Sequence, residues 1–469
     1  MPILFLLVPL LCIFILNLPG RETGGRIAPW VIGIACVLQA AMAATSGMDF
    51  WQVVDSTLIL PVPIPLDIDY ISAIVLFTIA LVAAAANVTG ANGDSRRRLN
   101  LCSLTLILMT GMNGVVMVAD LFSLYIFLEI TAVSSFILIA MNKDLAALEG
   151  AFKYLILSCL ATSAMLTANA LIFMQAGSLR FNDVSAVLLP GNSTVQIALV
   201  LYVVAFCVKS GAVPFHGWLP GAYSAAPDAV SVLLAGVVTK TGGVYVIIRM
   251  MSGMLNNLAA PGMSFMVIGA LSIILGAFAA MGQKNMKRML AYSSISQIGY
   301  IILAAGLGTP LALAGALFHF FNHAVLKSLL FINTTAVQEE AGGTDMDKLG
   351  GLAEKMKVTG WTSVIGLLST AGVPPFSGFW SKLLIIMALS MAGHWFYAAL
   401  ALLMSVATLG YFLIMQRRVF FGTLREGFEE LHESRPSLRN VSIVLAALTV
   451  LIGVLFPAAL AVMNAFGLS

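Results

Sequence analysis

The chain alternates between long apolar runs and short polar or Gly/Pro-rich breaks along its whole length. A bilayer offers no water to satisfy backbone groups, and a helix needs about 20 apolar residues to cross it, so these runs predict transmembrane helices. Cutting the chain at the breaks gives fourteen runs, at 2–18, 27–46, 71–91, 100–118, 121–141, 150–175, 193–220, 228–250, 262–282, 287–308, 310–334, 358–391, 394–416 and 440–466. We therefore predict an all-α polytopic membrane protein.

Composition supports this fold class and excludes several functions. Hydrophobic residues make up 60% of the chain and charged residues 10%, and the mean hydropathy of +0.99 is far above that of soluble domains. A net charge of +3 is too small to indicate a nucleic-acid partner. The five cysteines are scattered singly, without a CxxC pair or a histidine at metal-ligand spacing. We expect no disulfide, no metal site and no cofactor bound by this chain.

The basic residues predict an orientation in the membrane. With the N-terminus outside, only Arg180 and Arg249 fall in outside segments. Seventeen basic residues then fall inside: Arg21, Arg26, Arg96, Arg97, Arg98, Lys143, Lys284, Lys287, Arg288, Lys348, Lys355, Lys357, Arg417, Arg418, Arg425, Arg435 and Arg439. The positive-inside rule therefore predicts that both termini are periplasmic, and we expect a multi-pass protein of a bacterial inner membrane.

Two of the connecting segments carry their own expectations. The outside segment 49–69 contains TLILPVPIPLDI, whose alternation predicts a small extended hairpin. The inside segment 419–438 mixes phenylalanine with charged residues, and it is either a partner-binding segment or a solvated loop.

After this count of loop residues, five basic residues are left, all lysines: Lys153, Lys209, Lys240, Lys327 and Lys382. One acid joins them at mid-depth in its span, Glu129. A charge at the bilayer centre costs about 2.5–3.5 kcal/mol on insertion scales, so such residues indicate function. Lys209, Lys240 and Glu129 lie near the middle of their spans, and Lys382 follows a proline break. Lys153 lies within a turn of its span's end, where its side chain can reach the interface.

Three titratable residues share one face of a single span. His319, His323 and Lys327 are spaced i, i+4, i+8 in GALFHFFNHAVLKSLL. A lone histidine in a membrane helix is usually a packing residue, whereas three titratable groups in a row predict a path for protons. His216 lies beside the first proline break, and its membership of this set stays open.

Two spans are broken by proline, at GAVPFHGWLP in 193–220 and at AGVPPFSGFWSK in 358–391. The breaks are five spans apart, so the two helices run in opposite directions, which is typical of inverted repeats around a transport path. We predict one membrane domain, 1–469, with three N-terminal helices (1–99), two inverted five-helix repeats (spans 4–8, 100–250, and spans 9–13, 262–416) and a C-terminal helix (440–466). The breaks are expected to admit water and free carbonyls beside Lys209 and Lys382.

The combination of fourteen spans, KSGAVPFHGWLPGAYSAAPDAVSVLLAGVVTKTGGVY, the histidine–lysine stripe and PPFSGFWSK resembles the antiporter-like subunits of respiratory complex I, membrane-bound hydrogenases and Mrp-type Na+/H+ antiporters. The resemblance covers nearly the whole chain. It implies that Glu129 and Lys209 form a regulatory ion pair, that Lys240 is the central proton carrier and that Lys382 is the exit group. It assigns the relay between them to His319, His323 and Lys327.

The resemblance implies a proton- or sodium-translocating subunit of a complex-I-like oxidoreductase or membrane-bound hydrogenase. The alternative is the corresponding subunit of an Mrp-type antiporter, which differs in what drives it. A purely structural scaffold is disfavoured, because it would not need so many buried titratable groups. Whether the chain counts as an enzyme stays open, since any redox reaction must occur in partner subunits. The expected partners are other membrane subunits, the lipid bilayer and the transported ions.

Overall fold

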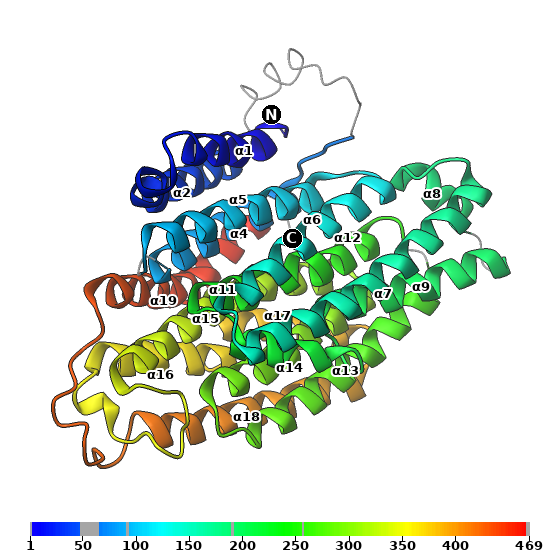
Figure 1. Cartoon of the computed structure of the whole chain (residues 1–469). Coiled ribbons are helices and arrows are strands. Elements are labelled where there is room, and N and C mark those ends of the chain that lie inside the picture. The colour runs from blue at the N-terminus through cyan, green and yellow to red at the C-terminus, as the bar shows by residue number, and fades with distance from the viewer. Residues whose placement is uncertain (1, 47–64, 91–92, 189–191, 256–257, 466–469) are drawn as a thin grey trace. The chain divides into compact units, whose positions relative to one another are not determined.

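The structure is a computed structural model that describes residues 2–46, 65–90, 93–188, 192–255 and 258–465 (Figure 1). Within these ranges twelve helices are long and apolar enough to cross a membrane, and two shorter apolar helices, Leu4–Asn17 and Ser377–Met391, accompany them. Each of the fourteen predicted runs corresponds to one helix or, at 193–220, 228–250 and 358–391, to several consecutive helical segments. The prediction of an all-α polytopic membrane protein is confirmed.

The chain divides into two compact units, Met1–Phe265 and Met266–Ser469, and the division falls within α13 (Ala259–Met281). The following helices lie wholly within the first unit: α1 (Leu4–Asn17), α2 (Arg21–Ala44), α4 (Tyr70–Thr89), α5 (Ser95–Met117), α6 (Leu121–Ile139), η1 (Ala140–Asn142), α7 (Leu145–Ala176), α8 (Phe181–Val187), α9 (Ser193–Ser210), η2 (His216–Trp218), α10 (Leu219–Ala225), α11 (Asp228–Leu233), η3 (Leu234–Val238), η4 (Lys240–Tyr245) and α12 (Val246–Ser252). Those of the second unit are α14 (Met286–Leu307), α15 (Pro310–Ala341), η5 (Leu352–Glu354), α16 (Lys357–Ala371), α17 (Ser377–Met391), α18 (Trp395–Val419) and α19 (Pro436–Ala465).

Short polar side chains fix where many of these helices begin. The first turn of a helix has backbone N–H groups without intrahelical partners, and an oxygen of the preceding residue can accept from them. Side chains at seven helix starts do so: Asp69, Asp94, Asp120, Asp144, Asn192, Asn285 and Thr309. Much of the acidic content near the spans is therefore explained by capping.

Both predicted helix breaks are present. Helix α9 ends at Ser210 and α16 ends at Ala371, and each is followed by a glycine in the left-handed conformation, Gly211 (φ 69°) and Gly372 (φ 86°). A proline segment follows each glycine before the chain resumes as η2 and α10, or as α17. Glycine adopts positive φ without steric cost, so these two positions allow the chain to leave the helix sharply.

The span at residues 228–252 contains an irregularity that the sequence pattern did not predict. Between α11 and α12 its backbone is π-helical, in η3 and η4, and every residue of the window that could cross the membrane is buried. Such wide turns are rare and occur frequently at functional sites. Lys240 is the first residue of η4.

The two connecting segments have different outcomes. Most of the expected hairpin, residues 57–64, lies outside the described residues, and Leu66 forms an isolated bridge with Val118. After α18 the chain runs without a helix to α19, and near the end of this run the Glu433 carboxylate accepts from Val358 N and Thr359 Oγ1 at the start of α16, both at 2.6 Å.

Candidate functional site

In the first unit, side chains from three helices, α6, α7 and α9, meet around the buried Lys209. This residue lies in the last turn of α9 and is 6% exposed. Its Nζ donates to Ser158 Oγ of α7 at 2.7 Å and lies 3.9 Å from Glu129 Oε1 of α6. The predicted pair is therefore present, but the closest partner of Lys209 is a hydroxyl that the sequence analysis did not select.

The helix break beside Lys209 frees carbonyl groups, as helix ends generally do. One of them, Val208 O, accepts a hydrogen bond from Trp218 Nε1 at 3.2 Å, and the indole also stacks on Tyr154 with 4.3 Å between ring centroids. The aromatic residue after the break thus closes the end of α9, and the Lys209 ammonium turns toward α6 and α7.

Lys240 is buried completely, with 0% of its surface exposed. Its Nζ donates to the carbonyl oxygen of Ala235, five residues earlier in the same span. Three residues beyond Lys240, Gly243 packs so closely on α9 that a Cβ at this position would lie 2.3 Å from Ser210 N. The backbone of η4 is therefore held directly against the end of α9, next to Lys209.

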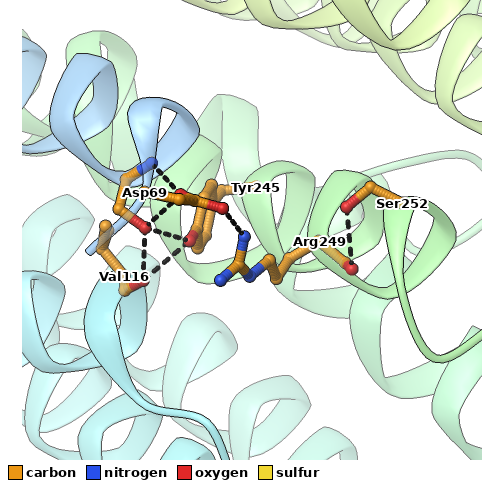
Figure 2. A network of polar contacts seen from close by, with 6 residues as sticks. Asp69, Val116, Tyr245, Arg249 and Ser252 are labelled. Carbon is orange, nitrogen blue, oxygen red and sulfur yellow. Dashed lines mark hydrogen bonds and ion pairs between the residues drawn. The ribbon is translucent and has the colours of Figure 1, made fainter. Parts of the chain in front are cut away.

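A polar network holds the other end of η4 (Figure 2). The Tyr245 hydroxyl donates to Val116 O of α5 at 2.7 Å. One turn further, Arg249 pairs with Asp69, which caps α4 by accepting from Ser72 N at 2.9 Å. The π-helical segment that carries Lys240 is thereby tied to α4, α5 and α9.

The Asp69–Arg249 pair predicts an acid-dependent loss of stability. Burial raises the pKa of Asp69, but hydrogen bonds from Ser72 and Arg249 and the guanidinium charge outweigh it, so the pKa is below its ordinary value. The carboxylate therefore stabilises the fold above the unfolded-state pKa, about 4, and this contribution disappears as pH falls through the lower folded-state value. We expect Asp69→Asn to be less stable at pH 7 by at most about 1 kcal/mol, because the side chain is more than a third exposed.

Thermal unfolding of wild type and Asp69→Asn in the same detergent between pH 7 and pH 3 tests this prediction. The two unfolding midpoints should converge as the pH falls. A difference that stays constant over this range would show that Asp69 acts through its shape and not through its charge.

The second unit buries its own lysine on α15. Lys327 is 0% exposed, and its Nζ donates to Leu290 O at 2.9 Å and to Ser293 Oγ, both on α14. The same ammonium lies 5.8 Å from the centre of the Phe412 ring of α18.

His319 and His323 are buried on the same face of α15 as Lys327, two turns and one turn before it in the helix, and the three residues form the histidine–lysine stripe. His319 is 2% and His323 is 1% exposed. Their rings are nearly parallel, at 11°, with 6.1 Å between centroids. His319 Nδ1 lies 2.9 Å from Ser381 Oγ of α17, one residue before Lys382. The three titratable side chains thus face the interior of the second unit.

Lys382 lies at the second break. It projects from the second turn of α17, is 3% exposed, and its Nζ lies 3.5 Å from the oxygen of Ala371, the last residue of α16. The ammonium also lies 4.5 Å from the centre of the Tyr300 ring of α14. Here the helix break does leave a carbonyl beside the buried cation, as expected from the proline in this span.

Comparison with known proteins places these features in a family. Residues 118–409 match the family model described as NADH:quinone oxidoreductase/Mrp antiporter, transmembrane. The chain belongs to this family. Over 351 residues it is 31% identical to an Na+/H+ antiporter subunit of Alkalihalophilus pseudofirmus, covering 74% of this chain and 71% of that protein. It is 33% identical to an NADH-quinone oxidoreductase subunit of Desulforudis audaxviator, also over 351 residues, covering 74% and 70%.

Among solved structures, a chain of the membrane-bound sulfane sulfur reductase, an archaeal respiratory membrane complex, is similar over nearly its full length. The TM-score is 0.86 at 29% identity, and the match covers 98% of this chain and 95% of that one. The resemblance drawn from the motifs is therefore confirmed for the fold and the family.

In this antiporter-like subunit, one polar helix face was not predicted from the sequence. Ser293, Gln297 and Tyr300 of α14 are spaced i, i+4, i+7, and all three are fully buried. Ser293 contacts Lys327, and the Tyr300 ring centroid lies 5.9 Å from that of His319. The stripe on α15 therefore faces a second polar stripe on α14. The run SSISQIGY carries the signal, since its polar residues fall at helical spacing.

The sequence left the roles of two further residues open, Lys153 and His216. Lys153 pairs with Glu149 of the same helix at 2.5 Å, and both side chains are more than half exposed. His216 lies in η2, within the first break, and is partly exposed. Within the described ranges no group of three His, Cys, Asp or Glu residues is placed to hold a metal ion.

Proposed function

We propose that this chain is a proton-translocating subunit of a multisubunit membrane complex, and that its buried lysines, histidines and glutamate carry the protons. The observation that supports this most strongly is the burial of Lys240 and Lys382. In the part of the chain that the structure describes, neither forms an ion pair with a carboxylate; each contacts a backbone carbonyl. Burying a cation in this way is costly, and an apolar residue would pack at lower cost, so a proton-carrying role explains why lysines are used.

In the first unit, proton transfer would begin at the Glu129–Lys209 pair. A charged Glu129 at 3.9 Å favours the ammonium form of Lys209, and neutralising Glu129 removes this attraction. Lys209 then holds its proton less tightly, with the Ser158 hydroxyl as its nearest partner. Lys240 lies in the segment that packs against the end of α9 and is the next proton carrier that we assign in this unit.

In the second unit, we assign the transfer path to two facing stripes. His323 and His319 would pass a proton between Lys327 and Lys382, and Ser293, Ser381 and the Tyr300 ring hold these groups in place. A histidine can accept a proton on one ring nitrogen and release one from the other, which suits it to a relay.

For the driving reaction, we propose a redox-driven complex whose flavin, iron–sulfur or other redox groups are held by partner subunits, with no cofactor in this chain. The full-length similarity to a chain of an archaeal respiratory complex supports this assignment. The second candidate is an Mrp-type assembly, supported by the similarity to a subunit of an Na+/H+ antiporter. We propose that the chain lies in a bacterial inner membrane, and its basic inside segments support periplasmic termini.

Purification of the intact assembly through a tag on this chain separates the two candidates. A redox-driven complex should carry flavin or iron–sulfur absorbance, and in proteoliposomes it should acidify the lumen when an electron donor is added. An Mrp-type assembly should lack these chromophores and exchange protons for sodium down an imposed gradient. A preparation that moves no protons under either driving force would overturn the proposed function.

Glu129→Gln tests the first step of the proposed path. The substitution keeps the shape of the side chain and removes the charge that lies 3.9 Å from Lys209. We expect proton flux per assembled complex to fall roughly threefold to tenfold, because a partly exposed carboxylate at this distance interacts only moderately. Asp183→Asn, on the short helix α8, is a matched control that should leave the flux unchanged. Equal flux in Glu129→Gln and wild type would remove Glu129 from the mechanism.

A further inference from the structure

We infer that the first unit contains a binding site for one anionic phospholipid, with the lipid phosphate held by Arg96, Arg97 and Lys143. A cavity of about 1180 Å³ lies where α1, α5, α6 and α7 have their ends, and these three basic residues line it. The same end of the unit is the one that the basic residues place inside.

The charge in the cavity favours an anion. Asp94 is the only acidic residue among the lining residues, and its carboxylate caps α5 by accepting from Arg97 N at 2.9 Å. The Arg97 guanidinium donates to Asn142 Oδ1 at 2.7 Å, which holds it in place without neutralising it. Within the described residues, Arg96 and Lys143 form no ion pair with a carboxylate. In the described part of the chain, two cations at this end therefore have no charge partner.

The part of the cavity farther from the basic helix ends favours acyl chains. Its walls include Leu104 of α5, Phe136 and Ile137 of α6, and Phe152 and Leu155 of α7. Leu104 is seven residues beyond Arg97 along α5, which is roughly 10 Å deeper at 1.5 Å per residue. Phe152 is 62% and Ile137 is 43% exposed, so part of the apolar wall is accessible from outside the unit. A site with cations at the helix ends and apolar walls below them matches a lipid and not a free phosphate ion.

The backbone at Lys143 points to a role for its side chain. Lys143 adopts a left-handed conformation, φ 58°, in the turn between η1 and α7, and it is the sole non-glycine residue with positive φ in the described chain. Glycine or asparagine adopts this conformation at lower cost. The backbone conformation of this turn therefore does not favour lysine over glycine or asparagine. The lysine side chain, in contrast, supplies one of the cations of the cavity.

Lipid binding to the purified full chain tests this site. Native mass spectrometry, with dioleoylphosphatidylglycerol added to the detergent-solubilised chain, should show one tightly retained lipid. In Arg96→Gln/Lys143→Asn, its apparent affinity should fall roughly 10- to 30-fold, since each basic residue near a membrane surface contributes roughly a fivefold step. Lys143→Asn relieves the left-handed lysine, so the variant should remain folded. The matched control is Arg417→Gln/Lys357→Asn, which removes two exposed basic residues from α18 and α16 of the second unit.

Two ligand controls separate the sources of the phosphate. Dioleoylphosphatidylcholine has the same acyl chains with a zwitterionic headgroup, and inorganic phosphate has no acyl chains. The inference requires that neither displaces the retained lipid at equal concentration. Equal retention of the two lipids, displacement by inorganic phosphate, or loss of binding in both double variants alike would overturn it. Detection of a neighbouring protein chain against Arg96 and Lys143 in the intact complex, with no lipid retained, would also overturn it.

Discussion

Lys240→Met should reduce proton flux by the assembled complex at least about 100-fold and leave the chain folded. Lys240 is fully buried and its ammonium contacts only the Ala235 carbonyl among the hydrogen bonds of the described residues. Methionine has a similar length and fills the same space without a charge. Replacing a buried charge by an apolar group of similar volume is frequently neutral or stabilising, so the unfolding temperature should stay the same or rise.

Two further variants separate proton transfer from fixed charge. Lys240→Arg keeps a positive charge but does not release its proton at any accessible pH, so it should lose flux as Lys240→Met does. Lys153→Met removes an exposed lysine whose partner is Glu149 on the same helix, and its flux should stay within about twofold of wild type. A fully active Lys240→Arg variant would mean that the ammonium acts as a fixed charge, and the proton-carrier assignment would then be wrong.

The sequence predicted the fold well, because membrane insertion leaves few alternatives. Apolar run length predicted the helices, and proline in a span predicted the breaks after Ser210 and Ala371. The wide turns of η3 and η4 were not predictable in this way. A π-helix depends on how its neighbours pack. Local signs were weak: η4 contains Gly242 and Gly243, and Gly243 packs against the end of α9.

The candidate site was predictable where it carries charge and not where it is neutral. A lysine or glutamate inside a span is conspicuous because of its insertion cost, and this reasoning selected Lys209, Lys240, Lys327 and Lys382, all now found buried in the two units. Ser158, Ser293 and Gln297 cost far less to insert and occur widely in membrane helices. Their role depends on which side chain faces them, and only the structure shows that Ser158 contacts Lys209 and that Ser293 contacts Lys327.

His323→Ala should slow proton flux roughly 10- to 100-fold without preventing assembly. His323 lies between His319 and Lys327 on the buried face of α15, and its ring is 6.1 Å from that of His319. Removing the imidazole interrupts this row of titratable groups, because it leaves a gap between Lys327 and His319. His319 is the residue that contacts Ser381, next to Lys382. Phe320 is the matched control on the same helix, since it is 0% exposed and carries no titratable group.

A packing role and a relay role for His323 predict opposite results. Under the relay, His323→Ala loses flux per assembled complex, whereas Phe320→Leu loses about 1–2 kcal/mol of stability and keeps its flux. Under a packing role, His323→Ala lowers stability as Phe320→Leu does, and every complex that still assembles pumps at the wild-type rate. Flux must therefore be normalised to assembled protein, with unfolding temperatures measured on the same preparations. Wild-type flux per complex in His323→Ala would show that the relay hypothesis is wrong, because a proton path that works without His323 does not pass through His323.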